Sequence, residues 1–125
     1  MKKIFASSAV AVFTLLAVSA AANPPNAIQA RYDASRGELY VQVEHVVSDR
    51  ASHFIDKVTV SKNGTEVASE SFDSQTSNRN QTLPPFKLKA ASGDKLTVTA
   101  ECNKWGEKSV TISVGLSQGI KDPKV

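Results

Sequence analysis

The sequence has very few of the residues from which metal centres, disulfides and nucleophilic sites are built. It contains one cysteine, Cys102, two histidines, His45 and His53, and a single methionine at the start of the chain. A lone cysteine cannot form a disulfide within the chain, so it is a buried thiol, a metal ligand or half of an intermolecular bridge. Two histidines also limit any metal site in one chain to two imidazole ligands.

Basic clusters and long apolar runs are missing beyond the first 18 residues. The formal net charge is +3, and Lys2 and Lys3 contribute two of these charges. No basic cluster remains that would suit a nucleic acid, and no apolar run after Val18 could span a membrane. The acidic residues are scattered, and neither a phosphate-binding loop nor a Gly-x-Ser-x-Gly motif is present. None of these patterns identifies an enzymatic site.

The first 22 residues have the organisation of an export signal. Lys2 and Lys3 give a positive start, residues 4–18 are apolar apart from a few hydroxyls, and Ala20-Ala21-Ala22 suits signal peptidase. The apolar run is shorter than the about 20 residues that a membrane span needs. We therefore expect a signal peptide over residues 1–22, cleavage near Ala22, and a mature protein in the periplasm or secreted.

The remaining 103 residues read as one all-β domain, 23–125, with a loosely held tail over 117–125. Apolar and polar residues alternate with period two, and no segment of helical period is longer than two turns. Asn63-Gly64 predicts a type I′ hairpin, and a bulge is expected between Ile55 and Val58. The pattern favours an immunoglobulin-like antiparallel β-sandwich of about seven strands. The expected strands are 27–32, 38–46, 54–62, 65–72, 86–89, 95–102 and 109–114, and residues 73–81 are expected to form a loop.

The scarce metal-binding residues fall at strand ends. His45 and Cys102 each close a predicted strand on its inward face, and His53 opens the strand after His45. If these ends meet, the three side chains converge at one end of the sandwich, and imidazole with thiolate suits zinc, copper or iron. The alternative is a strand-end histidine, a loop histidine and a core thiol with no metal. Trp105 is expected to pack over the end of the core, the alternative being an exposed contact residue.

Several short motifs follow one another in a definite order. They are His45, His53-Phe54-Ile55, Val58-Thr59-Val60, Asn63-Gly64, Gly93-Asp94, and Cys102-Asn103 with Gly106. This order, over about residues 45–114, resembles the iron-binding domain of the superoxide reductase (desulfoferrodoxin) family. The resemblance implies an immunoglobulin-like sandwich whose iron takes four histidines and one cysteine and keeps a sixth position open for superoxide. His45, His53 and Cys102 would be the matching ligands.

The departures from that family pattern bear directly on function. Trp105 stands where the family has its turn histidine, and an indole offers an N–H donor but no ligand lone pair. No histidine precedes His45, so one chain cannot build the four-histidine iron centre. We expect a non-enzymatic binding or accessory protein that meets a protein partner through an edge strand. The alternative is a metalloprotein with iron, zinc or copper on His45, His53 and Cys102 and residual redox activity.

A second family is similar in the His-Phe-Ile, Val-Thr-Val, Asn-Gly and Gly-Asp order. It is the small sandwich subunit of the thiosulfate-oxidising carrier complex, which pairs with a partner bearing a sulfur-carrying cysteine. That resemblance implies a non-catalytic subunit. Cys102-Asn103 fits the reductase family better, whereas the missing ligands fit a binding subunit. Both resemblances imply the same architecture.

Overall fold

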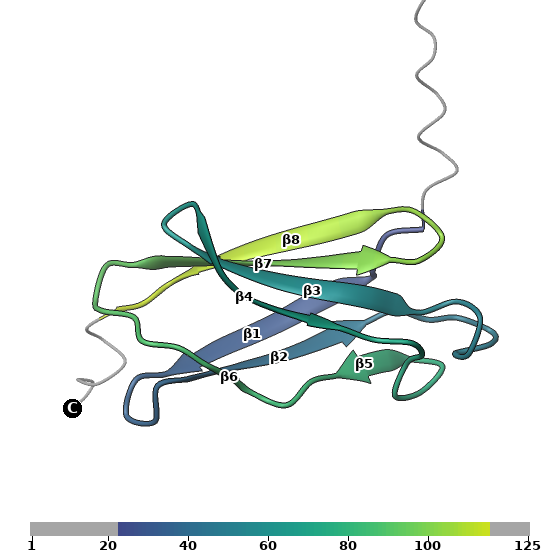
Figure 1. Ribbon diagram of the computed structural model, residues 1–125, viewed down its shortest axis with the longest axis horizontal. Helices are drawn as coiled ribbons and strands as arrows, with labels where there is room; N and C mark the ends of the chain where they lie inside the picture. The colour runs from purple at the N-terminus through teal and green to yellow at the C-terminus, as the bar shows by residue number, and fades with distance from the viewer. Residues whose placement is uncertain (1–22, 116–125) are drawn as a thin grey trace, which may run out of the picture.

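The computed structural model describes residues 23–115, which form β-strands and turns but no helix (Figure 1). Two antiparallel sheets make up the domain, β1–β2–β5 with β6 also on β2, and β4–β3–β7–β8. This confirms the predicted all-β sandwich. The strands are β1 (Ala27–Asp33), β2 (Glu38–Glu44), β3 (Ile55–Lys62), β4 (Thr65–Ser71), β5 (Asn80–Thr82), β6 (Phe86–Lys87), β7 (Lys95–Cys102) and β8 (Glu107–Ser113).

Two predicted segments, the signal peptide over 1–22 and the tail over 117–125, lie outside the described residues. Within residues 23–115, no helix could serve as a membrane span.

The strand order is that of an immunoglobulin-type sandwich, with β1, β2 and β5 in one sheet and β3, β7 and β8 in the other. β5 and β6 both pair with β2, at Gln42↔Thr82 and Leu39↔Phe86, on either side of Pro84-Pro85. Proline cannot donate to a ladder, which accounts for the interruption. The prediction of an unbroken loop up to residue 81 is wrong, because the short strand β5 pairs with β2. Its polar sequence gives no strand signal.

Local sequence signals fix the turns and the bulge. Asn63 and Gly64 have φ values of 52° and 89°, as the type I′ hairpin between β3 and β4 requires. The β3–β7 register shifts between Ile55 and Lys57, which puts both Ile55 and Val58 in the core at 0% exposure. The predicted bulge is therefore confirmed.

The core lies between the two sheets and reaches the end of the sandwich at which β2 and β7 finish. Alternating residues of the paired strands fill it, and their apolar side chains are buried, which drives the packing. His45 and Cys102 belong to this buried layer, at 2% and 6% exposure. The buried apolar cluster comprises Ile28, Tyr32, Leu39, Val41, Val43, Ile55, Val58, Val60, Leu83, Phe86, Leu96, Val98, Ala100, Cys102 and Val114.

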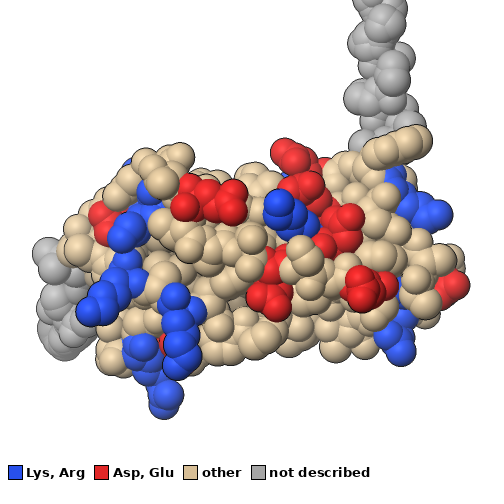
Figure 2. Space-filling model, in the orientation of Figure 1, with Lys and Arg blue, Asp and Glu red and all other residues tan. Residues whose placement is uncertain are grey.

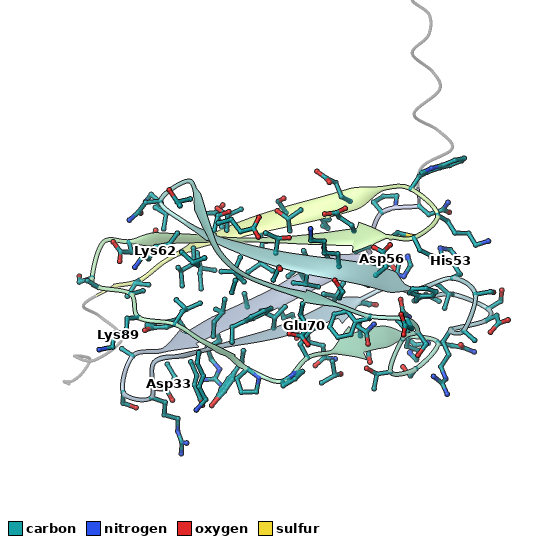
Figure 3. The ribbon with its side chains drawn as sticks, in the orientation of Figure 1. Asp33, His53, Asp56, Lys62, Glu70 and Lys89 are labelled. Carbon is teal, nitrogen blue, oxygen red and sulfur yellow. The ribbon has the colours of Figure 1, made fainter. Side chains whose placement is uncertain are left out.

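Charged residues are unevenly spread over the face seen in Figure 2. Lysine and arginine side chains gather mainly at the end that carries the β1–β2 turn, and acidic side chains lie over the middle. Lys62 and Lys89 lie toward that basic end, whereas His53 lies at the opposite end (Figure 3). The histidines are therefore remote from the main basic group on this face.

Candidate metal site

The structure brings together all three of the predicted metal ligands. His45 follows β2, His53 precedes β3, and Cys102 ends β7. Because Ile55 pairs with Cys102 across the β3–β7 ladder, the chain entering β3 is held against the end of β7. One ligand atom from each of the three residues lies within 4.8 Å of the others. The predicted convergence is present, and metal binding by these residues stays a prediction.

The distances between the three ligand atoms are close to those between ligands of a bound metal ion. At bond lengths of 2.0–2.3 Å, two ligands of one tetrahedral ion are about 3.5 Å apart. The widest pair in this cluster is at most 4.8 Å apart. Closing by about 1 Å needs small side-chain rotations and no change of strand pairing. The cluster is compact enough to form a first coordination shell.

Buried hydrogen bonds hold the His45 ring in place. Its Nδ1 lies 2.6 Å from Oε1 of Gln75, whose side chain is also buried, at 1% exposure. The backbone N–H of His45 donates to the carbonyl of Arg79 at 2.9 Å. A metal-ligating histidine characteristically uses its second ring nitrogen for such a contact. The other nitrogen, Nε2, is therefore the one available to an ion.

His53 presents a nitrogen with no partner. Its Nε2 is shielded from solvent and makes no hydrogen bond, the only such side-chain atom among residues 23–115. The ring meets that of His45 edge to face, with centroids 4.9 Å apart and planes at 85°. Burial lowers the pKa of His53, and the neighbouring His45 and Lys104 lower it further. These shifts favour the neutral imidazole, which is the form that binds metals.

Cys102 is a buried free thiol. Burial raises its pKa above the ordinary 9.0, although the backbone N–H of Lys104, 3.3 Å from Sγ, acts in the opposite direction. Without an ion, the raised pKa favours the protonated thiol near neutral pH, and a thiol is a weak nucleophile. A bound metal would reverse this, because a coordinated thiol is held as thiolate.

Trp105 is not where the sequence predicted it. We expected it to pack over the end of the core, but its side chain is 74% exposed. It lies in the turn after Cys102 with φ of 81°, and its carbonyl accepts a hydrogen bond from Asn23. The lead-in chain lies so close that a Cβ on Gly106 would approach the nitrogen of Pro24 to 2.6 Å. Backbone therefore packs against this turn, and the indole faces solvent.

Sequence reasoning missed two residues that support the cluster, Gln75 and Asn103. Gln75 belongs to a polar segment predicted to be a loop, and its contacts are with residues 20 and 30 positions away. The side chain of Asn103 binds Phe54 N–H and Ser52 O, on either side of His53. For Asn103 the available signal was its position directly after Cys102. For Gln75 no local pattern exists.

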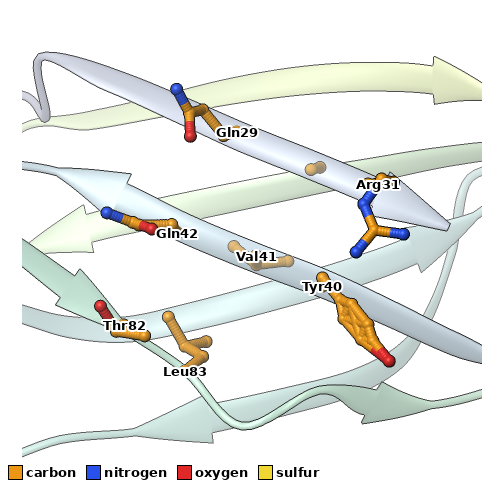
Figure 4. Close-up of a pocket in the computed structure, with 8 residues that line it drawn as sticks. Gln29, Arg31, Tyr40, Val41, Gln42, Thr82 and Leu83 are labelled. Atoms are coloured by element: carbon orange, nitrogen blue, oxygen red, sulfur yellow. The ribbon is translucent and has the colours of Figure 1, made fainter.

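A shallow hollow of about 420 Å³ lies on the outer face of the β1–β2–β5 sheet (Figure 4). Its rim includes Gln29 and Gln42, and the guanidinium of Arg31 covers the Tyr40 ring at 4.6 Å. The residues that line it include no histidine, cysteine or carboxylate. The hollow is thus a less suitable place for metal chemistry than the histidine–cysteine cluster.

Comparisons with known proteins return nothing: no family model, no curated protein and no solved structure matches the chain significantly.

Proposed function

We propose that this protein is an exported sandwich domain that binds one transition-metal ion on His45, His53 and Cys102. The observation that carries the proposal is the buried Nε2 of His53, which has no partner beside a second imidazole and a thiol. An unsatisfied buried polar atom costs about 1–3 kcal/mol. Coordination of an ion at this end of the sandwich would offset that cost.

The donor set selects the class of ion. Two imidazoles and one thiolate favour zinc or copper, and they do not suit magnesium or calcium, which prefer oxygen ligands. Three protein ligands leave at least one coordination position for water or another molecule. Iron of the superoxide reductase type would need four histidines, and the chain has two. We therefore propose a degenerate relative of that family with a binding or accessory role and no superoxide reductase activity.

Titration of the purified protein with Zn²⁺ against a chromophoric chelator tests the proposal. We expect one ion per chain and a rise in the unfolding temperature, because an ion that binds the folded state stabilises it. Cys102→Ser should lose both effects, whereas Ser109→Ala, on the exposed face of β8, should keep them. A wild-type protein that binds no Zn²⁺ or Cu²⁺ and is equally stable with chelator would overturn the proposal.

The redox alternative has its own test. If the three-ligand site has superoxide reductase activity, the iron-loaded protein would consume superoxide. The variant His53→Ala would lose this activity. We expect no such activity above that of free iron in buffer. Catalytic turnover by the iron-loaded wild type would replace the accessory role with an enzymatic one.

An accessory role also needs a surface for a partner. Of the two edge strands of the β4–β3–β7–β8 sheet, β4 is the more exposed. Of its seven residues only Ala68 is partly buried, and Val67 is 43% exposed. An unpaired edge strand can take an added strand from another chain. A partner that co-purifies with the wild type should be lost with Val67→Lys and retained with Lys108→Glu on β8. Equal retention by both variants would rule out the β4 edge.

A further inference from the structure

Gln75 forms hydrogen bonds with several segments around the candidate metal site. No sequence pattern predicts these contacts. Its backbone N–H donates to the carbonyl of Arg50 at 3.0 Å, and Arg50 Nη1 donates to its carbonyl at 2.8 Å. Its side chain reaches His45, directly after β2, and Ile55, the first residue of β3. One buried residue thus joins the segments that carry both histidines.

The hydrogen bonds of Gln75 determine which way its amide points. The amide nitrogen lies 3.0 Å from the carbonyl of His45 and 2.9 Å from the carbonyl of Ser77. Both neighbours are acceptors, so the group that faces them must be the NH₂. The oxygen, Oε1, then faces the other way, where it accepts the backbone N–H of Ile55 at 3.0 Å. A reversed amide would lose all three bonds.

This orientation fixes the protonation pattern of His45. Its Nδ1 lies 2.6 Å from Oε1 of Gln75, and an amide oxygen has no hydrogen to donate. The proton must therefore be on Nδ1. In a neutral imidazole the other nitrogen, Nε2, then carries the lone pair.

We propose that Gln75 is the positioning residue of this site: it holds His45 as the Nδ1–H tautomer and so presents Nε2 to the ion. The presentation of Nε2 to an ion rests on the proposed metal-binding function. The tautomer itself does not, since it is a property of the metal-free protein. Loss of such an outer contact typically weakens metal binding 10–100-fold. The ion meets a ligand that is already oriented before it arrives.

The chain provides a matched control in Gln81. It is equally buried, at 3% exposure, and its amide also makes four hydrogen bonds. None of them involves His45, because they go to Thr76, Ile55 and Ser74. Gln75→Met and Gln81→Met remove the same chemistry from the same region. Only Gln75→Met removes the hydrogen bond that fixes the tautomer of His45.

The experiment has two measurements. Nitrogen NMR of the metal-free wild-type protein, recorded in alkaline buffer, identifies which ring nitrogen of His45 carries the proton. We expect the proton on Nδ1. Competition with a chelator then compares the Zn²⁺ affinity of the two variants. We expect Gln75→Met to bind Zn²⁺ 10–100-fold more weakly than Gln81→Met, even if both variants are destabilised to the same extent.

The outcomes separate the two proposals. A proton on Nε2 of His45 in the wild type, or equal Zn²⁺ affinity of the two glutamine variants, overturns the role of Gln75 even if metal binds. A wild type that binds no metal overturns the proposed function, yet a proton on Nδ1 would still support the role of Gln75 in fixing the tautomer. If neither methionine variant folds, the wild-type spectrum decides.

Discussion

Asn103 and Phe54 exchange two hydrogen bonds, in which the backbone N–H of Asn103 donates to Phe54 O at 3.0 Å and Phe54 N–H donates to Asn103 Oδ1 at 2.9 Å. The amide of Asn103 also donates to Ser52 O at 3.1 Å. The residue after one proposed ligand, Cys102, thereby holds both neighbours of another, His53. The site is built from backbone fixed on each side of the ligand.

Asn103→Ala should therefore weaken metal binding by about tenfold, because His53 loses the contacts that orient its backbone. Stability should fall by about 1–2 kcal/mol, since two side-chain hydrogen bonds are lost. Zn²⁺ competition and urea unfolding measure the two effects.

The control is Asn63→Ala at the far hairpin. Asn63 also makes two side-chain hydrogen bonds, to Lys95 and Asp94, and its positive φ makes alanine unfavourable there. This variant should lose at least as much stability and keep its metal affinity. If both asparagine variants weaken metal binding alike, Asn103 acts through global stability alone.

His53→Phe tests whether the nitrogen without a partner is a cost of the site. In chelator the variant should be more stable than the wild type by about 1 kcal/mol, because the unsatisfied atom is gone. His45→Phe should have the opposite sign and destabilise by about 1–3 kcal/mol, because the buried Gln75 Oε1 loses its bond to the ring and keeps only that to Ile55 N–H. Urea unfolding in chelator measures both. A metal-free His53→Phe that is clearly less stable would show that the nitrogen has an undetected partner.

Much of this architecture was readable from the sequence because it depends on local patterns. Period-two alternation placed His45 and Cys102 on inward faces, and Asn63-Gly64 fixed a turn by its own backbone preferences. Gln75 and the strand at Asn80 were not predictable, because each is defined by partners far along the chain. Trp105 was misplaced for the same reason. What covers a turn is decided by another segment, in this case the lead-in chain at Asn23.

The core prediction concerns Leu39, which is fully buried between the sheets at 0% exposure. Leu39→Ala should cost about 2–5 kcal/mol through lost burial and the cavity left behind. Val67→Ala, on the exposed edge strand β4, should change stability by less than about 0.5 kcal/mol. Urea unfolding gives both values. A loss of under 1 kcal/mol at Leu39 would contradict the packing described for the two sheets.

Acid sensitivity should depend partly on Asp94. Its carboxylate accepts the backbone N–H of Ala91 and the amide of Asn63, and these bonds lower its pKa below the ordinary 3.8. A lowered folded-state pKa stabilises the protein fully above 3.8, and this contribution is lost as the pH falls through the lowered value. Asp94→Asn should therefore be less stable than the wild type at neutral pH, with a difference that shrinks in acid. Urea unfolding across pH 2–7 measures it, and a constant difference would contradict the assignment.

The most direct measurement of the central claim is the absorption spectrum of the purified protein titrated with Co²⁺, which reports a metal–thiolate bond. The account predicts a sulfur-to-cobalt charge-transfer band that saturates at one ion per chain. It also predicts that the band is absent in Cys102→Ser and weakened in His53→Ala. No such band in the folded wild type, or an undiminished band in Cys102→Ser, would contradict it.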